Sequence, residues 1–159
     1  MIFITFIFLL IGIFSNINNY IPEDAIEYAR KYCQNYNPAY KNYGTKNDFE
    51  TINFVSQSLF AGGQSFSGCR GKDNYSMIFV YNDMYECLSK KGWNITMTKN
   101  DKVKKGYPAF IKESRMLLLI TDFKDDKAIY CAHKIKKKDY CDAEIDEKDL
   151  VYFYLDNDN

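Results

Sequence analysis

The chain has 159 residues, and its 21 basic and 21 acidic side chains cancel to zero net charge at pH 7. No Lys, Arg, Asp or Glu precedes Glu23, so the rest of the chain is balanced as well, and there is no global basic field for binding nucleic acid or an acidic membrane. Aromatic residues make up 17% of the chain while Gly (8) and Pro (3) are few, which excludes a disordered polypeptide and indicates one folded domain.

The N-terminal segment is an apolar run from Ile2 to Phe14 that meets polar residues from Ser15 onward. The run is shorter than the roughly 20 residues of a membrane-spanning helix but fits the 7 to 15 or so of a secretory signal. We therefore predict a signal peptide over residues 1–15 and a secreted or vesicle-lumen protein without a stable membrane span. Because the segment has no Lys or Arg, an uncleaved signal anchor in the membrane is the alternative. Glycosylation sequons at Asn74 and Asn94 fit a secretory route.

Three helices are predicted in the first part of the chain. Proline followed by two acidic residues is typical of a helix start, and paired glycines or a single glycine of a helix end. On these signals the helices run from Pro22 to before Asn37, from Glu50 or Thr51 to Gly62-Gly63, and from Asp83 to Lys90 before Gly92.

Short apolar runs bounded by charges replace the helical period after Gly106 and predict strands. They cover Tyr107–Ile111, Met116–Thr121, Ala128–Ala132 and Val151–Leu155. Helices followed by an antiparallel sheet predict an α+β domain over residues 22–156. The basic cluster (Lys134, Lys136, Lys137, Lys138) reads as a solvated hairpin connection ending at Asp139. The acidic cluster (Glu144, Asp146, Glu147, Asp149) lacks the spacing of a calcium loop.

All five cysteines follow the predicted signal: Cys33, Cys69, Cys87, Cys131 and Cys141. In an oxidising compartment they would form up to two disulfides and leave one thiol, with a pairing that the sequence does not select. There is no Cys-x-x-Cys pair and only one His, so a zinc site has no usable ligand spacing. We expect neither a metal nor a cofactor.

The segment Asn53-Phe54-Val55-Ser56-Gln57, followed by Leu59 and Ala61-Gly62-Gly63, resembles the Putative amidase domain family of papain-like cysteine amidohydrolases. The family signature reads Asp-Cys-Thr-Asn-Phe-Val-Ser-Gln and continues with Leu and Ala-Gly-Gly. The resemblance implies a papain-like α+β fold in which a helix carrying the nucleophile packs on an antiparallel sheet. A helix N-terminus suits thiol chemistry because its dipole and free N–H groups stabilise a thiolate.

The family's catalytic residues do not carry over to this chain. The Cys position holds Thr51, preceded by Glu50 where the family has Asp. The catalytic His, at the start of the strand that ends in Thr121, corresponds to Met116 or to Arg115, and neither is a base at neutral pH. His133 resembles the third, orienting member of the site.

Loss of both nucleophile and base predicts a non-catalytic relative that binds, or serves as a scaffold for, a peptide or cell-wall amide. Asn53, Ser56 and Gln57 would either line its groove or only support the helix. The alternative is an active hydrolase that uses Thr51 or Cys69 as nucleophile, although Thr51 is better interpreted as a helix N-cap whose hydroxyl accepts an N–H. A Cys131–His133 catalytic pair is disfavoured because residues two apart on a strand lie roughly 6 to 7 Å apart. The sequence identifies neither the ligand nor the oligomeric state.

Overall fold

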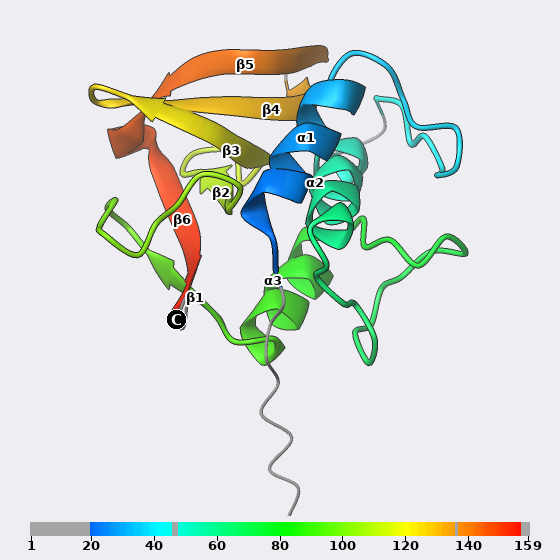
Figure 1. Ribbon diagram of the computed structural model, residues 1–159. Coiled ribbons are helices and arrows are strands. Elements are labelled where there is room, and N and C mark those ends of the chain that lie inside the picture. The colour runs from blue at the N-terminus through cyan, green and yellow to red at the C-terminus, as the bar shows by residue number, and fades with distance from the viewer. Residues whose placement is uncertain (1–19, 46–47, 136, 157–159) are drawn as a thin grey trace, which may run out of the picture.

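The computed structural model describes residues 20–45, 48–135 and 137–156 (Figure 1). Three helices precede a six-stranded antiparallel sheet, so the predicted α+β class is confirmed. Residues 1–15, the predicted signal peptide, lie outside the described part of the chain. Within that part, no helix is both long and apolar enough to cross a bilayer.

Helix α1 (Pro22–Tyr32) begins at the proline that marks it in the sequence. Its first turn carries Glu23 and Asp24 and its last turn carries Arg30, a charge distribution that complements the helix dipole. One face, which includes Ala25 and Ala29, is buried. The amphipathic pattern therefore places α1 on the outside of the helical layer.

Helix α2 (Phe49–Ala61) begins at Phe49, with Asp48 as its N-cap, just before the predicted start. The helix packs against α1, α3, β3 and β4, and every residue from Glu50 to Leu59 is buried. It ends before Gly63, whose φ of 91° is a left-handed conformation that favours glycine. Gly62 is required by packing, because a Cβ there would come within 2.6 Å of the Tyr20 ring. The two glycines are thus required by packing and by the helix end.

Helix α3 (Tyr81–Lys90) also begins slightly before its predicted start.

The sheet has the strand order β1-β6-β2-β3-β4-β5, and all neighbouring strands are antiparallel. The strands are β1 (Trp93–Thr96), β2 (Pro108–Ile111), β3 (Leu117–Lys124), β4 (Lys127–Ile135), β5 (Lys138–Asp146) and β6 (Leu150–Leu155), with a 3-10 turn η1 (Glu147–Asp149) before the last. The four predicted strands are present with shifted ends. Strands β1 and β5 were not predicted, because both are edge strands: β1 alternates apolar and polar residues, and β5 is rich in charge.

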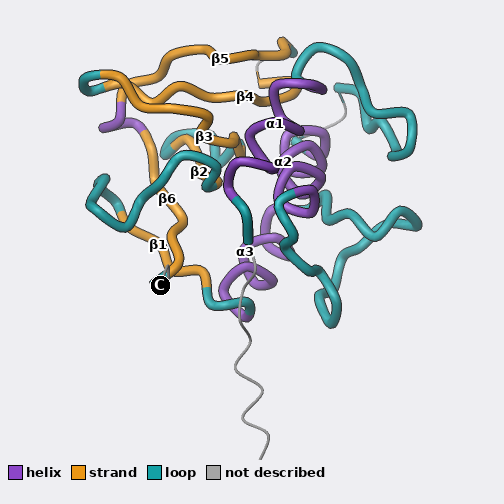
Figure 2. The backbone as a smooth tube through the Cα atoms, viewed as in Figure 1, coloured by secondary structure: helices purple, strands orange, loops and turns teal. Residues whose placement is uncertain are grey.

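The helices gather on one side of the sheet (Figure 2). On this helix face, Leu117 and Leu119 of β3 pack in one core cluster with residues of all three helices. On the opposite face, Leu118 and Ile120 belong to a second cluster that contains no helix residue. Since successive side chains of a strand alternate, the face of each β3 residue is fixed by its position.

Two disulfides are present among the described residues, and they leave one thiol. Cys33 at the end of α1 is bonded to Cys141 of β5, and Cys69 is bonded to Cys87 of α3. Cys131 on β4 is free and buried. The predicted number of disulfides is therefore present.

Candidate functional site

The region that corresponds to the cysteine amidase site is the first turn of α2. Thr51 is fully buried there, and its hydroxyl donates a hydrogen bond to the Asp48 carbonyl at 2.7 Å. Thr51 is therefore not the N-cap, and its hydroxyl donates to a carbonyl rather than accepting an N–H. The single proton of the Thr51 hydroxyl is used in this hydrogen bond to the backbone.

Glu50 and His133 form a buried pair beside Thr51. The Glu50 Oε1 atom lies 3.0 Å from His133 Nδ1, and the two side chains are 1% and 2% exposed. His133 Nε2 donates to the Tyr32 carbonyl at 2.7 Å, because a carbonyl oxygen can only accept. The imidazole is also stacked on the Phe54 ring, with centroids 4.0 Å apart, and lies 4.5 Å from the Tyr36 ring. With both nitrogens and its ring faces engaged, His133 is held in one position.

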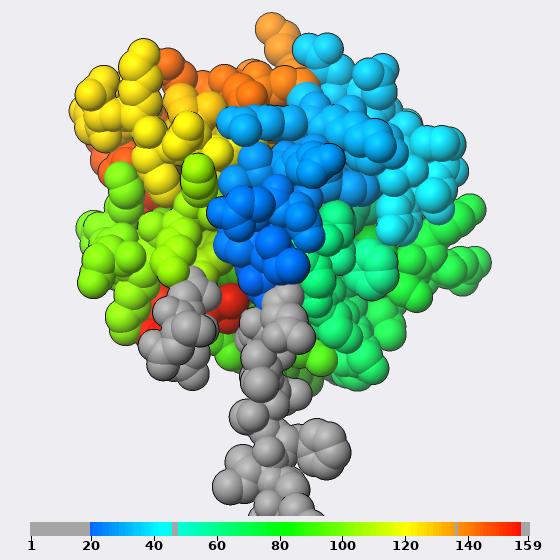
Figure 3. All heavy atoms as spheres, viewed as in Figure 1, coloured from blue at the N-terminus to red at the C-terminus, as the bar shows by residue number. Residues whose placement is uncertain are grey.

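The second oxygen of Glu50 is bonded to the loop between α1 and α2. Its Oε2 atom accepts from the Tyr43 backbone N–H at 2.8 Å and from the Asn53 amide at 3.3 Å. In the space-filling view, α1 and the start of this loop form a continuous blue and cyan surface on this side of the molecule (Figure 3). Through one carboxylate, Glu50 thus joins α2 to the loop between α1 and α2 and to β4. Sequence comparison marked this position as a substituted Asp but did not predict its role.

The residues at the expected base position lie on two different faces of the sheet. Met116 packs with the cluster on the face opposite the helices, so its side chain is not brought to Thr51. Arg115 has a φ of 57° and places its guanidinium 5.9 Å from the centre of the Tyr81 ring, near α3. The first residue of β3 that faces the helical layer is Leu117. Neither candidate supplies a vacant base position beside α2.

The cysteines offer no activated thiol near the site. Cys69 is in a disulfide, so it is not a free nucleophile. Burial raises the pKa of the Cys131 thiol to about 11, and its sulfur accepts a hydrogen bond from the Asp142 N–H at 3.4 Å. His133 is bonded elsewhere, so Cys131 and His133 do not form a pair. At neutral pH Cys131 is a protonated core residue.

The polar residues Asn53, Ser56 and Gln57 of the signature are buried and form hydrogen bonds within the protein. Asn53 donates to the Lys41 carbonyl at 2.9 Å, Ser56 donates to the Asn53 carbonyl at 3.0 Å, and Gln57 accepts from the Tyr28 hydroxyl at 2.7 Å. None of the three is more than 5% exposed. Of their two predicted roles, these contacts favour support of the helix.

The remaining predicted sites lie at the surface. Asn74 is exposed in a turn, whereas the Asn94 amide on β1 donates to Asp156 at 2.9 Å. In the basic cluster, Lys134 pairs with Asp139 at 3.2 Å, and part of the acidic cluster lies on β5. Within the described ranges, no group of three or more His, Cys, Asp or Glu side chains is arranged to hold a metal ion.

A groove of about 640 Å³ lies between α3 and the sheet. Its apolar wall combines Tyr81 and Tyr85 of α3 with Phe110 and Val151 of the sheet, and exposed Ile95 and Met97 complete one edge. Lys112 and Arg115 stand in its lining, and none of the described lining residues is acidic. We call this the α3 groove. It combines an aromatic surface with positive charge, and no periodic pattern in the sequence predicts it.

Comparison with known proteins gives one match. The family described as Putative amidase domain matches residues 19–108, from before α1 to the start of β2. The matched part includes Thr51 and the Ala-Gly-Gly sequence and ends before Met116 and His133. No curated protein and no solved structure matches the chain.

Proposed function

The chain belongs to the Putative amidase domain family, and from this premise we propose that it is a non-catalytic member that uses the domain to bind a peptide ligand. The observation that carries the proposal is the environment of Thr51. At the family's nucleophile position this side chain is fully buried and its hydroxyl donates to a backbone carbonyl. A nucleophile needs an approachable atom and an adjacent base, and Thr51 has neither.

The alternative of an active hydrolase receives no support from the other candidates. Cys69 is bonded to Cys87, and Cys131 is buried with a raised pKa. His133, the only histidine, is bonded to Glu50 and to the Tyr32 carbonyl. Glu50, next to the nucleophile position, and His133 instead hold α2, β4 and the loop between α1 and α2 together.

The α3 groove is the surface that suits ligand binding. Tyr85, Ile95 and Met97 are exposed at 39%, 43% and 60%, and such clustered apolar side chains favour an interaction site. Lys112 and Arg115 add positive charge without an acidic neighbour in the lining, which favours an acidic partner. We infer a peptide with an apolar side chain flanked by carboxylates, the first for the aromatic wall and the second for the cations.

A secretory location fits this role. The two disulfides are typical of an oxidising compartment, and Asn74 is exposed where a glycan could be attached. The proposal places the protein outside the cell or in a secretory vesicle after removal of residues 1–15.

Binding of synthetic peptides tests the function. Three fluorescent peptides of equal length would carry a central Leu flanked by Glu, by Gln or by Lys, and fluorescence anisotropy would measure their dissociation constants. The Glu peptide should bind tightest. Arg115→Gln should weaken the Glu peptide and leave the Gln peptide unchanged, whereas Met97→Ser should weaken all three.

Lys124→Gln is the matched control, since Lys124 is exposed at the end of β3 and does not line the groove. It removes the same charge as Arg115→Gln and should leave all three dissociation constants unchanged. Equal binding of the three peptides, or equal effects of the two charge removals, would refute the groove as the ligand site.

A further inference from the structure

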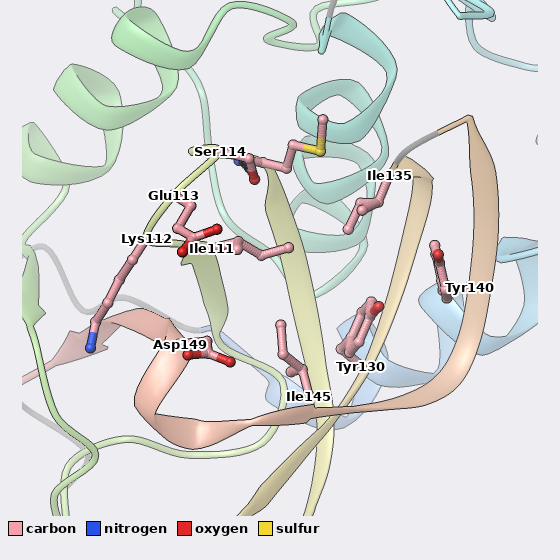
Figure 4. Close-up of a pocket in the computed structure, with 10 residues that line it drawn as sticks. Ile111, Lys112, Glu113, Ser114, Tyr130, Ile135, Tyr140, Ile145 and Asp149 are labelled. Atoms are coloured by element: carbon pink, nitrogen blue, oxygen red, sulfur yellow. Dashed lines mark hydrogen bonds between the residues drawn. The ribbon is translucent and has the colours of Figure 1, made fainter.

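A second cavity, of about 560 Å³, lies on the face of the sheet opposite the helices. Figure 4 shows its lining residues approaching from the β2–β3 loop, from β4, from the curved strand β5 and from the 3-10 turn. It shares only Lys112 with the α3 groove. We call it the β cavity. Its size and its position inside a curved sheet are those of small-molecule sites rather than of a flat protein interface.

The wall of the β cavity is mostly apolar. Ile111 and Met116 come from β2 and the loop after it, Ile135 and Ile145 come from β4 and β5, and the rings of Tyr130 and Tyr140 have centroids 5.6 Å apart. This lining would bury an apolar body and excludes a strongly hydrated ligand.

Tyr130 provides a polar group inside this wall. Its side chain is 5% exposed and lines the cavity, yet its hydroxyl has no hydrogen-bond partner among the described residues. The comparably buried Tyr152, by contrast, donates to the Glu147 carbonyl at 3.3 Å. Burial raises the pKa of Tyr130 to about 12, so its phenol keeps its proton at neutral pH and acts as a donor. Because this hydroxyl lines the cavity and is hydrogen-bonded to none of the described residues, it can donate to an acceptor on a bound molecule.

Three charged residues at the edge of the β cavity, which we call its rim, determine the charge that a ligand can carry: Lys112, Glu113 and Asp149. Glu113 and Asp149 are exposed carboxylates, and the one rim ammonium, on Lys112, donates to the Lys148 carbonyl. Two carboxylates against one ammonium leave the rim with a net negative charge, which disfavours an anionic head group.

We propose that the β cavity binds a small uncharged molecule with an apolar body and a carbonyl-type acceptor for the Tyr130 hydroxyl. This site goes beyond the proposed peptide binding, because it lies on the other face of the sheet and takes a different chemical class. Occupancy of one site does not require occupancy of the other.

The experiment uses two uncharged naphthalene probes with the full chain. The first, 6-propionyl-2-(dimethylamino)naphthalene, carries a ketone, and the second, N-phenyl-1-naphthylamine, does not. Both should bind at one saturable site with blue-shifted emission. Tyr130→Phe should weaken the ketone probe by roughly three- to tenfold, the effect of one hydrogen bond, and leave the second probe unchanged. Tyr85→Phe, the same change in the α3 groove, is the matched control and should affect neither.

Filling the cavity should abolish binding of both probes. Met116→Trp fills it from one wall and Ile145→Trp from the other, so a variant that fails to fold, judged by thermal unfolding, can be replaced by the other. The sulfonated analogue 1-anilinonaphthalene-8-sulfonate should bind more weakly than N-phenyl-1-naphthylamine. Absence of saturable binding, equal loss of both probes on Tyr130→Phe, unchanged binding in a folded filled variant, or preference for the sulfonate would each overturn the proposal.

Discussion

Replacing His133 by Ala would test the assignment of the Glu50–His133 pair as a structural connection between α2 and β4. The substitution leaves the Glu50 carboxylate, which is 1% exposed, without its charged or hydrogen-bonding partner. Removing one member of a buried pair costs about 3–5 kcal/mol, because the remaining charge has lost its compensation. The ring of Phe54 also loses the imidazole stacked at 4.0 Å. We expect the free energy of unfolding to fall by at least about 3 kcal/mol.

Glu50→Gln is the matched variant because it keeps the volume and removes the charge. A Gln oxygen can still accept from the Tyr43 N–H, and its amide can donate to a neutral His133 Nδ1. This change should cost only about 1 kcal/mol, the value of an altered hydrogen bond. In the double variant no buried charge is stranded, so Glu50→Gln with His133→Ala should be more stable than His133→Ala alone.

Urea unfolding would measure these differences through the single tryptophan, Trp93, which is 3% exposed in the core. The four proteins complete a double-mutant cycle. A His133→Ala variant within about 1 kcal/mol of the wild type, or a double variant less stable than His133→Ala, would refute the reasoning.

Three further outcomes are expected. Replacing both Cys33 and Cys141 by Ser removes a disulfide with a sequence separation of 108. The free energy of unfolding, measured by thermal unfolding, should fall by up to about 5 kcal/mol, and an unchanged melting temperature would contradict this expectation. Because burial raises the pKa of Cys131 to about 11, iodoacetamide should label this thiol only after unfolding, and rapid labelling of the native protein would count against its burial. Hydrogen bonds from Lys90 first and then from Arg70 lower the pKa of Glu86 from 4.5 to about 2. The ionised Glu86 carboxylate therefore stabilises the fold above pH 4.5, and this stabilisation is lost as the pH falls towards 2. The difference in stability between wild type and Glu86→Gln should shrink over that range, and a difference that persists at pH 2 would argue against the ion pair.

The helices were predictable from local signals. Pro22 and the glycines at 62 and 63 act on the backbone next to them, so their effect can be read without knowledge of the fold. Strand β5 could not be read in this way. Its charged residues, such as Lys138 and Asp142, lie at an edge with partial cover, where strand formation depends on pairing with β4.

The site was harder to predict because it depends on faces and on distant contacts. Met116 lies one residue from Leu117, and this single step turns a strand side chain from the helical layer to the β cavity. The Glu50–His133 contact joins residues 83 apart in sequence, and only the packing of α2 on β4 brings them together. Sequence reasoning predicted that the catalytic residues are replaced, but it did not predict the Glu50–His133 contact.

Hydrolysis in H₂¹⁸O is the most direct test of the central claim that the domain binds without catalysis. Each cleaved amide incorporates ¹⁸O into the new carboxylate, so mass spectrometry of a complex peptide mixture detects turnover without knowledge of the substrate. The proposal predicts that incorporation by the wild type equals that of Thr51→Val and of buffer. Incorporation above buffer that disappears in Thr51→Val would contradict it and would restore Thr51 as a nucleophile.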